Sequence, residues 1–178
     1  MTMEHIAAAM QRVESVLRRR PDTGVHDDAP ATARWQGSGL DVVSTHDNGT
    51  AVATNLSREI GGSGDKVSPG WLMRAGVASC AASSIILRAA VVGIELTRLE
   101  VVARSRSDTR GLLGMAGADG TAVDPAPLAI ELDVRIAARD ATREQLQQLV
   151  DEAHRCSPIP AAVANGVPTH VHVEIEDG

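Results

Sequence analysis

The chain has 178 residues, a length typical of one domain, and a formal net charge of −6. Apolar residues make up 43% of it and charged residues 22%, the proportions of an ordinary globular protein, which exclude wholesale disorder. The acidic balance and the lack of Phe and Tyr argue against a nucleic-acid partner, which requires basic patches and aromatic stacking platforms.

The first thirty residues predict a helical extension followed by a linker. Apolar residues recur every three or four positions over residues 4–19, and a polar stretch follows over residues 21–30. Glycine-containing turns then separate three short segments of strand-forming residues, which predicts an antiparallel meander. These segments are 32–36, 40–45 and 50–55.

A long helix is predicted over residues 68–92, at the centre of the fold. Ser68 can cap its N-terminus, Pro69 suits its first position, and Gly93 can end it. The middle of the segment is uncharged and rich in small residues. This pattern is typical of a helix that is buried on all sides.

Three later segments alternate between apolar and polar residues, which predicts half-buried antiparallel strands; they are 99–104, 128–137 and 167–175. A second helix should begin at Thr142, because Gln145 three residues on completes a capping box. Strands, a central helix, two strands, a helix and a last strand define an α+β fold. We expect an antiparallel sheet of about six strands around the long central helix.

The chain is expected to be soluble and cytoplasmic, with no membrane partner. Its N-terminus lacks the apolar stretch of a signal peptide, and its uncharged run at 75–87 is too short to span a bilayer. The two cysteines, Cys80 and Cys156, are too few for a secreted disulfide scaffold. Their spacing leaves two interpretations open: inert buried residues, or redox-active thiols.

Two stretches resemble motifs of the OsmC/Ohr family. Residues 68–82, SPGWLMRAGVASCAA, are similar to its central-helix motif, and residues 154–159, HRCSPI, are similar to its second-cysteine motif. The order of elements is similar from about Thr32 to Asp177. The resemblance implies an OsmC-like domain over residues 31–178, an added N-terminal extension over residues 1–30, and an intertwined homodimer.

The resemblance also implies a thiol-dependent peroxidase that reduces organic hydroperoxides. Cys80 would be the peroxidatic cysteine and Cys156 the resolving cysteine that closes a disulfide with it. A dithiol such as a lipoylated protein would reduce that disulfide, and no metal or bound organic cofactor is needed. Apolar residues around both motifs favour organic hydroperoxides over hydrogen peroxide. The alternative is an OsmC-fold protein without peroxidase activity that binds a small apolar ligand.

The motifs differ from the family pattern in two places. Gly70 stands ten positions before Cys80, where peroxide-reducing members usually have a Glu that partners an Arg. Ser157 is inserted between the second cysteine and the proline that commonly follows it directly. A thiolate needs a nearby cation or dipole. We therefore expect Arg58 in the loop before the helix, or Arg74 on the helix, to stabilise the Cys80 thiolate.

Overall fold

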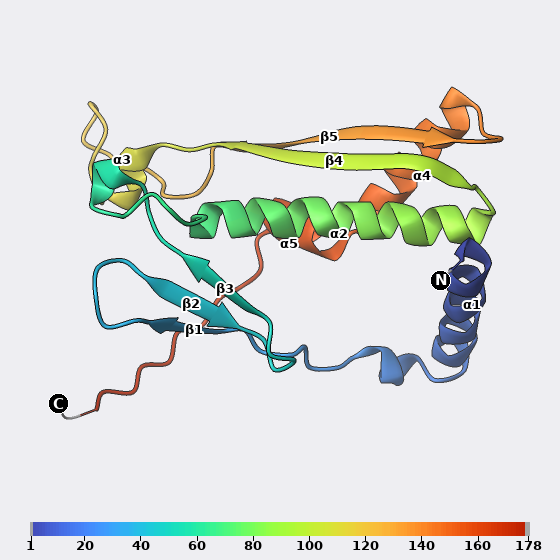
Figure 1. Ribbon diagram of the computed structural model, residues 1–178, viewed down its shortest axis with the longest axis horizontal. Helices are drawn as coiled ribbons and strands as arrows, with labels where there is room; N and C mark the ends of the chain where they lie inside the picture. Colours follow the sequence, from blue (N-terminus) through green and yellow to red (C-terminus); the bar gives the residue numbers. More distant parts are fainter. Residues whose placement is uncertain (1, 177–178) are drawn as a thin grey trace.

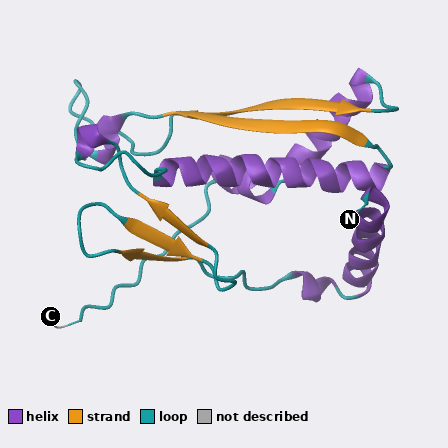
Figure 2. Cartoon of the chain, in the orientation of Figure 1, coloured by secondary structure: helices purple, strands orange, loops and turns teal. Residues whose placement is uncertain are grey.

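The computed structural model describes residues 2–176 and has the predicted succession of strands and helices as far as α4 (Arg143–Arg155), the second predicted helix after the first sheet (Figures 1 and 2). The predicted boundary at residue 178 therefore lies outside the described residues. In chain order the elements are α1 (Met3–Arg19), η1 (Pro21–Gly24), β1 (Thr32–Trp35), β2 (Val42–Thr45), β3 (Ala51–Thr54), η2 (Arg58–Ile60), α2 (Pro69–Val92), β4 (Leu96–Arg106), α3 (Thr109–Leu112), β5 (Ala129–Ala138), α4 (Arg143–Arg155) and α5 (Pro158–Asn165).

Helix α2 begins and ends at the predicted residues. The Ser68 hydroxyl accepts a hydrogen bond from the backbone N–H of Trp71 at 3.1 Å, and Gly93 ends the helix in the left-handed conformation, with φ +74°. The prediction of burial on all sides is wrong for the single chain. The buried residues of α2 follow one stripe at four-residue spacing, joined by Ala90: Val77, Ala81, Ile85 and Ala89. The opposite face is exposed, because no element of residues 2–176 covers it.

Length and apolarity alone would let α2 cross a membrane. Its most apolar 18-residue window has a mean hydropathy of 1.7, and 28% of that window is buried. The helix nevertheless packs against β4, α1, α4 and α5. That surrounding is the one expected of a core helix. The sequence-based argument used only the uncharged run at 75–87, which is shorter than the 24-residue helix.

The described strands form two separate sheets, which corrects the prediction of one sheet of about six strands. β1, β2 and β3 pair as an antiparallel meander, and β4 pairs with β5 in a long antiparallel hairpin. The hairpin covers one side of α2 along its length, while the three-stranded sheet lies below the N-terminal half of α2 (Figure 1). No hydrogen-bonded ladder joins the two sheets among residues 2–176.

The predicted last strand is absent from the described structure. Residues 167–175 are extended coil that leads away from the other elements, and their apolar side chains are exposed; Ile175, for example, is 90% exposed. The alternation of the sequence is that of a half-buried strand. A strand forms only on a sheet edge, and within residues 2–176 this segment pairs with none.

The hydrophobic core lies between α2 and α4. Its buried centre is Ile85, Ala89, Leu149 and Ala153, and Met3 of α1 packs against it. Helix α4 begins with the predicted capping box: the Thr142 hydroxyl accepts from the Gln145 N–H at 3.2 Å, and the Gln145 side chain accepts from the Thr142 N–H at 2.8 Å. Predicted and observed structure agree here because a cap depends on residues three apart.

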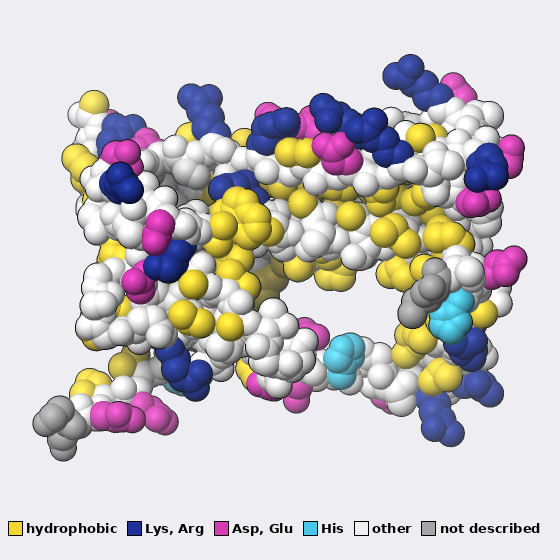
Figure 3. Space-filling view, in the orientation of Figure 1, with side chains coloured by type: hydrophobic (Ala, Val, Ile, Leu, Met, Phe, Trp, Pro, Cys, Tyr) yellow, Lys and Arg dark blue, Asp and Glu magenta, His cyan; other side chains and the backbone are white. Residues whose placement is uncertain are grey.

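An opening lies between α2, the three-stranded sheet, the linker and α1 (Figure 3). Its upper rim is formed by apolar side chains of α2, and α1 bounds it on one side. The facing halves of these two helices carry exposed apolar residues, among them Val13 of α1 (52% exposed) and Leu87 and Val91 of α2. The single chain therefore leaves an apolar surface uncovered around this opening.

Candidate functional site

Cys80 lies half-buried in the middle of α2, and its sulfur accepts two hydrogen bonds. The backbone N–H of Ile159 donates to Sγ at 3.4 Å, and the hydroxyl of Ser157 donates to it at the same distance. Both donors come from the start of α5. The Ile159 side chain lies beside Gly76, one turn earlier on α2, where an added Cβ would make an ordinary van der Waals contact with its Cδ1 at 3.8 Å.

The start of α5 is suited to hold a negatively charged sulfur. Ser157 is its N-cap residue and Pro158 occupies the first helical position. The first N–H groups of a helix have no partner within the helix and carry a partial positive charge, so anions are stabilised there. The N–H of Ile159 is one of these groups. Both donors are thus directed at the sulfur from the N-terminal end of α5.

Cys156 lies on the other side of this junction, as the C-cap residue that follows α4. Its thiol is free and exposed, and it lines a cavity of about 460 Å³. The Arg88 guanidinium of α2 bonds the Glu152 carboxylate of α4 at 2.7 Å beside it. The Gln148 amide and the Arg88 guanidinium hold the pKa of Glu152 below its usual range. The cavity around Cys156 thus has charged walls and an apolar side formed by Met10 of α1.

The tertiary structure brings the two cysteine motifs together. They are separated by 76 positions in the chain, yet the residue directly after Cys156 touches the sulfur of Cys80. Both thiols are free in the structure. Cys80 does not line the cavity of Cys156, but Ser84, one turn further along α2, does.

Neither candidate arginine donates to Cys80 among the residues that the structure describes. Arg58 donates from Nε to the Ser63 carbonyl at 2.9 Å, within the loop before α2. Arg74 donates to the Ser105 hydroxyl on β4 at 3.0 Å, and its guanidinium lies 3.6 Å from where a Cβ on Gly70 would be. Arg74 therefore lies where a side chain at position 70 would meet it, and it serves packing between α2 and β4.

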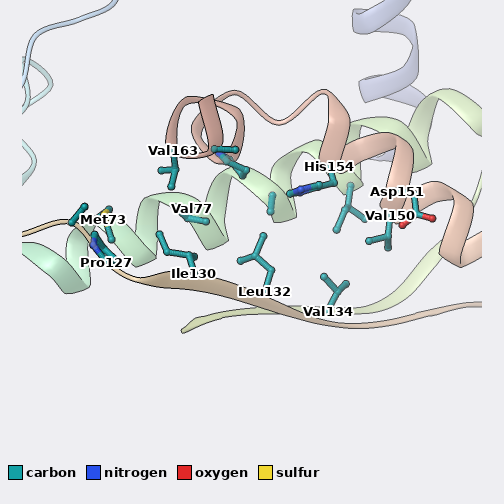
Figure 4. Close-up of a pocket in the computed structure, with 15 residues that line it drawn as sticks. Met73, Val77, Pro127, Ile130, Leu132, Val134, Val150, Asp151, His154 and Val163 are labelled. Carbon is teal, nitrogen blue, oxygen red and sulfur yellow. The ribbon is translucent and has the colours of Figure 1, made fainter. Parts of the chain in front are cut away.

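An apolar cavity of about 620 Å³ lies on the neighbouring face of α2 (Figure 4). Met73 and Val77 of α2, Ile130 and Leu132 of β5, and Val163 of α5 point into it. Two polar side chains, His154 and Asp151 of α4, lie toward one end.

Helix α5 connects this cavity with the cysteine. Its first residues hold the sulfur of Cys80, while Pro160, Val163 and Ala164 line the cavity. A thiol and an apolar chamber thus share one short helix. A molecule with an apolar tail and a reactive polar group is the kind of ligand that such a site suits.

Residues 62–172 match the protein family described as OsmC-like protein. The chain belongs to the OsmC-like family. The match contains both cysteine motifs, and it begins after the first sheet. No curated protein matches the sequence.

Solved structures of similar fold support the membership of this OsmC-like protein. An organic hydroperoxide resistance protein from Elizabethkingia anophelis is 20% identical, with a TM-score of 0.57 over 80% of this chain and 91% of that chain. An OsmC-like protein from Mycoplasma pneumoniae is 14% identical, with a TM-score of 0.63 over 80% and 91%. The organic hydroperoxide resistance protein OhrB of Bacillus subtilis is 23% identical, with a TM-score of 0.51 over 79% and 93%. At these identities the likeness concerns the fold.

The sequence did not identify two residues of this site as functional, Ser157 and Ser84. Ser157 was visible only as an insertion in the second motif, and Ser84 only as one small residue among many on the long helix. The structure joins them, since the Ser84 hydroxyl donates to the Ser157 hydroxyl at 3.3 Å. The insertion of Ser157 was the one sequence signal for this pair of serines. It separates the proline from the cysteine by one residue and places a hydroxyl at the N-cap of α5.

Proposed function

We propose that this OsmC-like protein reduces organic hydroperoxides, with Cys80 as the nucleophile. The observation that carries the proposal is the pair of donors on the Cys80 sulfur, supplied by the motif that contains the second cysteine. The family membership and the fold shared with proteins named for organic hydroperoxide resistance support the same chemistry. The apolar cavity beside the site supplies room for the organic part of the substrate.

The first step oxidises Cys80 by two electrons. The thiolate sulfur attacks the terminal oxygen of the hydroperoxide, an S–O bond forms and the O–O bond breaks. The other oxygen leaves as an alkoxide and takes a proton to become the alcohol. Cys80 is left as a sulfenic acid, and one hydroperoxide yields one alcohol.

The second step uses Cys156. Its thiolate attacks the sulfenic sulfur, hydroxide leaves and is protonated to water, and a disulfide joins the two residues. Cys156 is exposed, so an external dithiol can reach this disulfide. Exchange then restores both thiols and converts the dithiol to its own disulfide. A lipoylated protein is the class of reductant that we propose.

The positions of the two arginines favour a second candidate function, the binding of a small apolar ligand. Arg58 and Arg74 are bonded elsewhere, so the cation expected beside the thiolate is supplied by neither in the structure. The apolar cavity would then bind a small apolar ligand without turnover. Purified protein with dihydrolipoamide and cumene hydroperoxide separates the two functions. Catalytic loss of the hydroperoxide supports the peroxidase, whereas binding of an apolar fluorescent probe without turnover supports the alternative.

We also propose that the protein is a homodimer. The exposed face of α2, the apolar rim of the opening and the unpaired residues 167–175 are features of a chain that lacks a partner. Contiguous apolar surface of this kind is rare on monomers. A second copy would cover α2 and offer a sheet edge to the C-terminal segment.

Light scattering should therefore find a species of about twice 18.6 kDa at micromolar concentration. The variant Leu87→Asp places a charge on the exposed face of α2 and should shift the population toward the monomer. Leu112→Asp, on the exposed α3 turn, is the matched control and should leave the dimer intact. A stable 18.6 kDa species in the unmodified protein would contradict the proposal.

A further inference from the structure

We infer that Ser157 is a catalytic residue of this site, whose buried hydroxyl stabilises the Cys80 thiolate, and that Ser84 positions it. This inference rests on the proposed function, because it assigns a role in activating the same nucleophile. In this inference a neutral hydroxyl stabilises the thiolate, a role that the sequence analysis expected of an arginine. The residue concerned is the one inserted into the second-cysteine motif.

Ser157 is completely buried, so its hydroxyl must be hydrogen-bonded to avoid a large desolvation cost. An N-cap serine usually accepts a hydrogen bond from its own helix, but the Ser157 side chain makes no such bond. It donates to the Cys80 sulfur at 3.4 Å instead, and accepts from Ser84 at 3.3 Å. Its geometry therefore serves the cysteine rather than the cap.

The direction of this chain of hydroxyls suits a negatively charged sulfur. The Ser84 hydroxyl donates its hydrogen to the oxygen of Ser157. The hydroxyl hydrogen of Ser157 is therefore directed at the sulfur of Cys80. Hydrogen bonds in such a chain polarise one another, so Ser84 strengthens the bond that Ser157 makes. The Ile159 N–H adds a second donor from the start of α5. A thiolate can only accept, and both neighbours donate.

The ionisable groups of the surrounding helices are engaged elsewhere. Helix α5 carries none, and on α2 Arg74 bonds Ser105 while Arg88 bonds Glu152 of α4. At the end of α4, His154 lines the apolar cavity and Arg155 lines the cavity of Cys156. Among the described residues, the polar contacts of the Cys80 sulfur are thus those from α5 alone.

The test measures the alkylation of Cys80 by iodoacetamide in the full chain with Cys156→Ser, so that one thiol remains. The readout is the ratio of the rate at pH 7 to the rate at pH 10. A hydrogen bond stabilises the thiolate relative to the thiol. Its removal in Ser157→Ala should therefore reduce the fraction of thiolate at pH 7 and lower this ratio about tenfold. Ser84→Ala should lower it about twofold, since it acts through Ser157. Ser83 is exposed at the preceding position of α2, so Ser83→Ala should leave the ratio unchanged.

Equal ratios in Ser157→Ala and the parent would overturn the inference, as would an equal loss in Ser83→Ala and Ser84→Ala. A fall in rate that is the same at both pH values also overturns it, because it would show an effect on access alone. Should Ser157→Ala fail to fold by circular dichroism, the comparison of Ser84→Ala with Ser83→Ala decides. No peroxide enters the assay, so a lack of peroxidase turnover is a separate result that counts against the proposed function only.

Discussion

Cys80→Ser should abolish the consumption of cumene hydroperoxide. A serine hydroxyl at this position cannot form the sulfenic acid, so no step of the proposed cycle proceeds. The expected loss is at least a thousandfold in kcat/KM, to the level of the dithiol alone, since an enzymatic rate enhancement is commonly about a millionfold or more. The measurement is the disappearance of hydroperoxide with dihydrolipoamide as reductant.

Cys156→Ser is the informative comparison for this loss. Cys80 can still react once, so one equivalent of hydroperoxide should be consumed rapidly, and turnover should then stop or slow. Mass spectrometry should find an added oxygen on Cys80, which does not pass to a disulfide in this variant. If Cys156→Ser loses the single turnover and Cys80→Ser keeps it, the two roles are reversed.

The second large effect concerns the substrate. The protein should prefer an alkyl or aryl hydroperoxide to hydrogen peroxide by roughly a hundredfold in kcat/KM. Burial of apolar groups contributes about 0.8 kcal/mol per CH₂, and four such groups account for that preference. The cavity beside α5 has an apolar wall and about 620 Å³ of room, which exceeds what such a tail needs. Hydrogen peroxide has no apolar part to bury there.

Val163→Phe tests whether this cavity is the origin of the preference. Val163 lines the cavity and is 46% exposed, so a larger side chain can be accommodated by the fold while it narrows the entrance. The ratio of kcat/KM for cumene hydroperoxide to that for hydrogen peroxide should fall about tenfold, corresponding to about two lost methylene contacts. Val167→Phe, outside the cavity and 64% exposed, is the matched control. An unchanged ratio in Val163→Phe would place the organic tail elsewhere.

Local sequence signals were enough for most of the secondary structure. The capped ends of α2 at Ser68 and Gly93 and the capping box at Thr142 depend on residues within four positions of each other. The three-stranded meander depends on turns of a few residues. The α+β class and the family followed, since the motifs around the two cysteines are contiguous in the chain.

Only the tertiary structure decided which groups touch the nucleophile. The donors on Cys80 come from Ser157 and Ile159, more than seventy positions away, and no local pattern encodes that distance. The arginine expected beside the thiolate is instead bonded within its own loop, because the side chain of Arg58 reaches the carbonyl of Ser63. The sequence by itself determined the two cysteines and the helices beside which they stand, while the packing of α5 against α2 determined what surrounds the sulfur of Cys80. The strand predicted at residues 167–175 is missing for the same reason. The alternation of apolar and polar residues specifies a segment that can pair as a strand, but pairing needs a sheet edge, and within residues 2–176 this segment pairs with none.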